Sequence, residues 1–217
     1  ELYCSGLGLE DISFLAGLPL VDLNISTNRI TDVSPLSGMP LRTLAIAHND
    51  IRSIEPLRGM PLETLEMVGN QVESLVPLAG APLGNLECEG NPLRSLDPFI
   101  DDPPPQRFTF YTATLPEAEL ERAIEAWSAM PDQAHNVLAA EVIKVLNSGR
   151  PERLRSLGSS FEGSTYLFVQ TVMTLDAADS LARQAGGHLL TVVSAEELEF
   201  VERLRPYVAP VWLGLRP

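Results

Sequence analysis

The chain has 217 residues, with 15 lysines and arginines against 29 aspartates and glutamates, so its formal net charge is −14. This acidity argues against nucleic acid as a partner, because phosphates are bound through clustered basic side chains, and against docking to anionic lipid. One domain per roughly 100–200 residues predicts one or two domains. No apolar run reaches the roughly 18 residues of a membrane span, so we expect no membrane insertion.

A repeat of 21 residues runs through the first half of the chain, with copies that begin at Pro19, Pro40, Pro61 and Pro82. The shared pattern is L-x-x-L-x-I-x-x-N-x-I-x-x-[IVL]-x-P-L, and it resembles the short, internalin-like leucine-rich repeat over residues 1–100. Alternating apolar residues predict short strands with one face inward. We therefore expect a solenoid of about five coils, with parallel strands on its concave face and turns or a single 3₁₀ turn on its convex face.

Each copy also carries an asparagine just after its strand, whose side chain we expect to turn inward and satisfy buried backbone groups. These residues are Asn28, Asn49, Asn70 and Asn91. Cys4 and Cys88 share an inward position but lie four coils apart, roughly 19 Å at about 4.8 Å per strand. A disulfide needs Cα atoms within about 7 Å, so we predict two free, buried thiols.

The residues between the inward positions are predicted to face the concave surface and to bind a protein or peptide partner. They are Asp22, Asn24, Ser26, Thr43, His48, Thr64, Glu66, Asn85, Glu87 and Glu89. The three glutamates give this face an acidic end, and a merely solvated sheet face is the alternative. The face lacks the aromatic and arginine side chains that usually dominate interfaces. A flat face rarely supplies the 6–8 converging oxygens of a calcium site, so we predict no metal.

The middle of the chain changes character at residues 101–105, whose sequence DDPPP predicts a stiff linker. A capping box of Thr114 and Glu117 predicts the start of a helix, with Trp127 as the packing anchor of its apolar face. A second helix is predicted over residues 132–146. The two helices either cap the apolar end of the last coil or dock against the segment that follows.

From residue 164 the pattern becomes strand, helix, apolar run, helix and strand. This order resembles the opening half of a C-type lectin-like domain over residues 160–217. The matching segments are Ala177-Ala178 and Leu181, Gly186-Gly187-His188-Leu189, Thr191-Val192-Val193-Ser194-Ala195-Glu196-Glu197, Phe200-Val201 and Trp212-Leu213-Gly214-Leu215. The resemblance implies a partial domain, because the calcium and sugar ligands of that family lie after the W-L-G strand. Ala182 stands where the family usually has a cysteine, so its core disulfide is not expected.

No set of residues predicts catalysis, since the three histidines lie in separate segments and no G-x-S-x-G, H-E-x-x-H or phosphate-binding loop occurs. The carboxylates lie on solenoid faces or helix surfaces, where exposed acids usually lack a raised pKa. We therefore predict neither enzymatic activity nor a cofactor.

The predicted fold is α+β, with a leucine-rich repeat solenoid at 1–100, a linker and helical connector at 101–159, and a partial lectin-like domain at 160–217. The predicted function is a non-catalytic protein-interaction or scaffold module of a larger protein. One alternative is glycan binding through a completed lectin-like domain, which that resemblance places at a cell surface. The other is the regulatory region of a bacterial protein kinase, since the combination of modules resembles large multidomain bacterial proteins.

Overall fold

The computed structural model describes residues 1–111, 114–161, 163–169, 175–190, 194–204 and 211–215. Contacts divide the chain into two compact units, Glu1–Gln133 and Ala134–Pro217. The two helices that follow the repeats therefore belong to different units, and the three-part division of the sequence remains a prediction.

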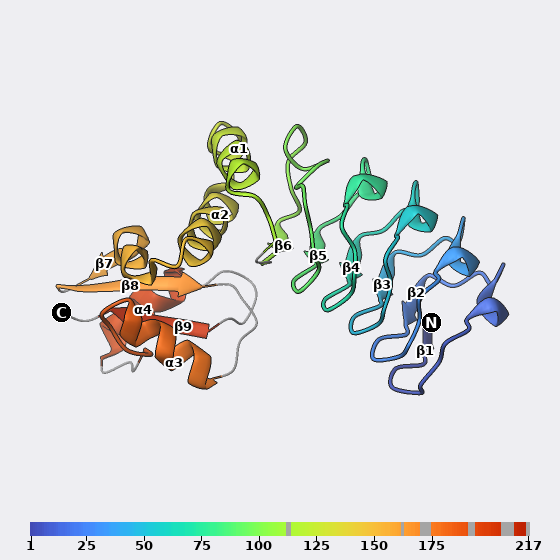
Figure 1. Ribbon diagram of the computed structural model, residues 1–217, viewed down its shortest axis with the longest axis horizontal. Coiled ribbons are helices and arrows are strands. Elements are labelled where there is room, and N and C mark those ends of the chain that lie inside the picture. Colours follow the sequence, from blue (N-terminus) through green and yellow to red (C-terminus); the bar gives the residue numbers. More distant parts are fainter. Residues whose placement is uncertain (112–113, 162, 170–174, 191–193, 205–210, 216–217) are drawn as a thin grey trace. The chain divides into compact units, whose positions relative to one another are not determined.

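The first unit is a leucine-rich repeat solenoid whose strands form one parallel sheet in chain order (Figure 1). Its strands are β1 (Leu2–Tyr3), β2 (Asp22–Asn24), β3 (Thr43–Ala45), β4 (Thr64–Glu66), β5 (Asn85–Glu87) and β6 (Arg107–Thr109). Leu23, Leu44 and Leu65 are direct neighbours across the strands and are buried. The 21-residue repeat therefore sets the register, and the predicted parallel stacking is confirmed.

The opposite side of each coil carries a short 3₁₀ turn, as the repeat length predicts. These turns are η1 (Ser13–Leu15), η2 (Ser34–Leu36), η3 (Glu55–Leu57) and η4 (Val76–Leu78). Proline occupies the second residue of η2, η3 and η4. Its fixed φ and missing N–H donor suit a turn that needs no ladder hydrogen bond, while the leucine that follows it is buried.

Buried asparagine side chains connect each coil to the one before it. The Oδ1 of Asn70 accepts from the backbone N–H of Ile51 at 3.1 Å, and its Nδ2 donates to the carbonyls of Ile46 at 2.9 Å and Met67 at 3.1 Å. Asn49 and Asn91 repeat this arrangement one coil to either side. One side chain per coil thus satisfies three backbone groups that strand pairing does not reach.

The sheet continues beyond the point where the sequence ends the repeat. Strand β6 pairs with β5, so that Phe108 lies beside Leu86, and Pro104 and Pro105 are buried rather than part of an exposed linker. Arg107 pairs with Asn85, a spacing of 22 residues instead of 21. Because of this extra residue and the phenylalanine in place of leucine, the sixth coil does not match the repeat pattern.

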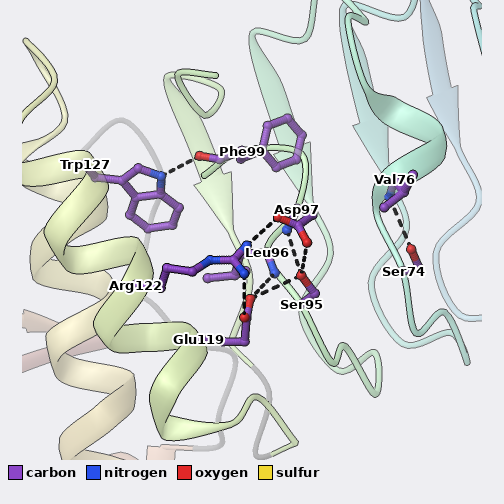
Figure 2. A network of polar contacts seen from close by, with 9 residues as sticks. All are labelled: Ser74, Val76, Ser95, Leu96, Asp97, Phe99, Glu119, Arg122 and Trp127. Carbon is purple, nitrogen blue, oxygen red and sulfur yellow. Dashed lines mark hydrogen bonds and ion pairs between the residues drawn. The ribbon is translucent and has the colours of Figure 1, made fainter. Parts of the chain in front are cut away.

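Helix α1 (Glu117–Ser128) covers the last coil. Trp127 is fully buried, donates from Nε1 to the carbonyl of Phe99 at 2.6 Å, and meets Phe108 and Phe110 edge-on. Its role as a packing anchor is confirmed, and α1 takes the capping alternative. Figure 2 shows that the indole and the polar side chains of α1 point toward the same coil.

A polar network next to that indole also holds α1 against the last coil. Arg122 pairs with Asp97 and, at 3.1 Å, with Glu119, whose carboxylate also accepts from the Ser95 hydroxyl (Figure 2). Pro116 holds the N-cap position of α1, which corrects the predicted position of the cap at Thr114. The hydroxyl of Thr114 donates to the carbonyl of Leu93.

The second unit combines helices with a small antiparallel sheet of order β7-β8-β9. Its elements are α2 (Ala134–Asn147), η5 (Pro151–Leu157), β7 (Ser159–Phe161), β8 (Ser164–Val169), α3 (Leu175–Gln184), α4 (Ala195–Leu204) and β9 (Val211–Leu215). Its core joins α2, η5, β8 and α3, so α2 takes the docking alternative. The buried core residues are Val142, Leu154, Leu167, Ala182 and Ala185.

Two helix termini of this unit lie within the segments quoted for the lectin-like resemblance. Gly186 adopts a φ of +81° just after α3, and Ser194 accepts from the N–H of Glu197 at the start of α4. The carboxylate of Glu197 accepts from the Tyr166 hydroxyl at 2.6 Å. The motif residues Thr191, Val192 and Val193 lie outside the described residues. Among the described helices, none is long and apolar enough to cross a membrane.

The two cysteines are free, but only one is fully buried. Cys88 lies inside the stack, and burial raises the pKa of its thiol well above the ordinary value. Cys4 is half-buried, which corrects the expectation of two buried thiols. It follows β1, the edge strand of the sheet, so the described chain covers its coil on one side only.

Replacement of Asn70 by alanine should lower the free energy of unfolding by about 2–4 kcal/mol, because three buried backbone groups lose their partner. Urea denaturation of the full chain, followed by circular dichroism, measures this loss. Asn85→Ala is the matched control and should cost less than about 1 kcal/mol, since its amide donates only a 3.4 Å bond to Glu87. Equal losses in the two variants would contradict the structural role of the buried asparagines.

Candidate functional site

The concave face of the solenoid is built from rows of side chains that the register aligns across strands. One row contains Asp22, Thr43, Thr64, Asn85 and Arg107, and the next contains Asn24, Ala45, Glu66, Glu87 and Thr109. A third row follows the strand ends and contains Ser26, Ala47, Val68 and Glu89. The predicted face residues of the strands thus share one surface, and its neighbouring glutamates and Arg107 lie at the β4–β6 end.

His48 occupies a turn position rather than a strand. It has a φ of +54°, and the equivalent residues of neighbouring coils, Thr27, Gly69 and Gly90, also have positive φ. A Cβ on Gly69 would lie 2.7 Å from His48 Nδ1. The imidazole therefore packs over the next coil, at the edge of the face, in a backbone region that favours glycine.

The acidic end of the face begins with Glu66 and Glu87, which lie opposite each other on β4 and β5. Both are half-buried. Desolvation raises the pKa of Glu66, the charge of Glu87 raises it further, and Arg107 opposes the shift. Like charges placed side by side on neighbouring strands repel, so this pair raises the energy of the unliganded face.

Glu89 departs most from the sequence-based expectation that the acids of this face are exposed. It keeps only 7% of its surface exposed. Burial, followed by the charge of Glu87, raises the pKa of Glu89 to about 7. A carboxyl group in this environment exchanges its proton near neutral pH, whereas an exposed glutamate is fully ionised there.

Sequence reasoning missed one charged residue of the face. Arg107, on β6, directs its Nη2 toward Glu87 Oε1 at 3.9 Å. The buried Nε of Arg107 and the buried Oδ1 of Asn85 have no hydrogen-bond partner in the described part of the chain. The R-F-T-F-Y segment, with Phe108 and Phe110 inward, repeats the alternation of the earlier strands and was the available signal.

This arrangement offers charge and hydrogen bonds but no assembled reactive centre. Within the described ranges, no group of three or more histidine, cysteine, aspartate or glutamate side chains has the geometry of a metal site. The surface can supply carboxylate acceptors from Glu66, Glu87 and Glu89 and one guanidinium from Arg107. Such a set recognises charged and hydrogen-bonding groups of a partner.

Comparison with known proteins finds similarity to solved internalin structures from Listeria monocytogenes. One is internalin C2, with 27% identity and a TM-score of 0.44 over 50% of this chain and 48% of that chain. Another is an internalin F, with 24% identity and a TM-score of 0.47 over 54% of this chain and 36% of that chain. The aligned part spans less than half of either structure. No protein-family model and no curated protein sequence matches.

Two glycines of the turn position form a matched pair for testing the contact with His48. Gly90→Ala should cost about 1–2 kcal/mol of unfolding free energy through its positive φ alone. Gly69→Ala should cost about 1 kcal/mol more, because its new Cβ meets the imidazole. Adding His48→Ala should remove that excess in urea denaturation, whereas an excess that survives His48→Ala would contradict the contact.

The raised pKa of Glu89 predicts a pH-dependent loss of stability. Below its ordinary pKa of 4.5 the carboxyl is protonated in both states, and between pH 4.5 and 7 only the unfolded state ionises. The unfolding free energy should therefore fall by up to about 3 kcal/mol across this range and then level off. Subtracting the profile of Glu89→Gln from that of the wild type isolates this effect, and a flat difference would contradict it.

Proposed function

We propose that the solenoid is a non-catalytic protein-interaction module and that its concave face is the binding surface. The main support for this proposal is the aligned rows of polar side chains, because their charge changes along one continuous face. The convex side of the solenoid is occupied by the 3₁₀ turns, and its last coil is covered by α1, so both regions already have a structural role. The half-buried, charged end at Glu66, Glu87 and Arg107 adds groups that the core of the fold does not use.

The proposal is supported by the way the fold holds this face in place. Strand pairing, buried leucines and one asparagine bridge per coil fix the backbone under every row. A partner therefore meets side chains that are already positioned, which lowers the entropic cost of binding. Scaffolding of neighbouring domains remains compatible with the same rigid solenoid.

The test is selection of peptides on the full chain. A random peptide library displayed on phage is panned on the immobilised protein, and each clone is measured against two double variants. Thr43→Trp with Thr64→Trp places bulk on the concave rows, whereas Thr31→Trp with Gln71→Trp places it on exposed sites outside those rows. We expect the first variant to weaken binding at least about tenfold and the second to leave it within about twofold. Clones that bind all three proteins equally, or a failure to enrich any clone, would contradict the proposal.

A second candidate function belongs to the second unit, for which we propose the opening half of a C-type lectin-like fold. The order β8, α3, α4 and β9, with β9 antiparallel to β8, supports this assignment, as does the Ser194 cap of α4. Glycan binding would need residues that follow the W-L-G strand in that family. A glycan array with a chain that includes those residues, read with and without calcium, tests it, and an absence of any calcium-dependent signal would count against it.

A further inference from the structure

We propose that the acidic end of the concave face, formed by Glu66, Glu87 and Glu89, holds a lysine or arginine side chain of the protein partner, and that this cation displaces a proton from the site. The inference rests on the proposed binding role of the concave face and specifies the chemistry of its partner.

The first observation is the convergence of three acids on one surface. Glu66 and Glu87 are direct neighbours across β4 and β5. Glu89 follows two residues after Glu87, and the intervening Cys88 points into the core. Strand alternation therefore directs Glu87 and Glu89 to the same side, and the charge of Glu87 acts on both of the other glutamates.

The second observation is independent of this clustering. Glu89 is more than nine-tenths buried, and its carboxylate makes no hydrogen bond or ion pair with any described residue. A carboxylate that is mostly buried and has no donor is unfavourable, because folding removes much of its water and supplies no donor in exchange. Asn85 adds a buried Oδ1 that also lacks a donor. These acceptors match the several N–H donors of a guanidinium or an ammonium group.

The charges around the acids favour a cationic occupant over a neutral one. Glu66 comes from β4, Glu87 and Glu89 from the β5 segment, and Arg107 from β6. Arg107 is the one basic residue in these described strands, and it lies 3.9 Å from Glu87. Its charge also acts on Glu66, whereas the only charge among the described residues that acts on Glu89 is that of Glu87. Residues 1–107 as a whole carry 15 acidic and 6 basic side chains, a net charge of −9, which attracts a basic segment from a distance.

Proton release follows from the environment of Glu89. Its pKa of about 7 means that the carboxyl is largely protonated at pH 6 and largely ionised at pH 8. A cation pairs with the ionised form. The fraction of molecules in which Glu89 is ionised rises about tenfold between these two pH values, and only these molecules are ready to bind. The affinity for a basic side chain should rise by the same factor.

The experiment extends the phage selection to the clones that depend on the concave face. A triple variant, Glu66→Gln with Glu87→Gln and Glu89→Gln, removes the acids and keeps their shape. Its matched control, Asp50→Asn with Asp101→Asn and Glu125→Gln, changes the net charge equally at exposed sites. We expect these clones to be rich in lysine or arginine. One synthetic peptide from such a clone should bind the triple variant at least about tenfold more weakly and the control variant within about twofold.

The same peptide, titrated by calorimetry at pH 6 and pH 8, tests proton displacement. The wild type should bind about tenfold more tightly at pH 8, and Glu89→Gln alone should abolish this difference. Clones that depend on the concave face but lack basic residues, or that bind the triple variant unchanged, would overturn the inference and leave the proposed function intact. A pH-independent affinity in the wild type would overturn the proton-displacement part.

Discussion

The solenoid depends on keeping its coils in phase, and the buried asparagines are the interaction that does so. A coil of 21 residues with three-residue strands leaves most of its backbone outside the ladder, and buried N–H and C=O groups without partners are costly. Asn70 resolves this at one point by bonding to the N–H of Ile51 and the carbonyl of Ile46 in the preceding coil and to the carbonyl of Met67 in its own coil. A shift of one residue between coils would break the two bonds to Ile46 and Ile51, so the same side chain fixes the register.

That register also determines the proposed binding face. Glu66 lies opposite Glu87 because their coils are in phase, and Arg107 reaches Glu87 because β6 joins the sheet with the same alternation. The face is therefore a consequence of the repeat and is not built separately from it. Side chains on it can change without disturbing Leu65 or Leu86, which fill the core from the opposite side of the same strands.

The sequence revealed the parts of this arrangement that repeat. The spacing of Asn28, Asn49, Asn70 and Asn91 and the alternation around them sufficed to place the first five strands, the convex turns and the members of the face other than Arg107. The sixth coil was hidden because Phe108 replaces leucine and the spacing lengthens by one residue, while the prolines of DDPPP imitate a linker. The sequence also could not predict that α1 and α2 belong to different units. Both helices have similar apolar stripes, and only packing decides which surface each one covers.

The burial and pKa of the residues on the concave face were harder to predict than which residues lie on it. The alternation placed Glu89 on the face, but its burial depends on the surroundings supplied by a coil that the pattern did not predict. Equivalent positions in the other coils hold Ser26, Ala47 and Val68, so the solenoid does not require an acid at this point of the repeat. A carboxyl with a pKa near 7 lowers the stability of the folded chain at neutral pH, and glutamine would fill the same space without that cost. The packing of the repeat therefore does not explain the presence of Glu89, whereas the partner cation that we propose would supply a donor that the described residues do not.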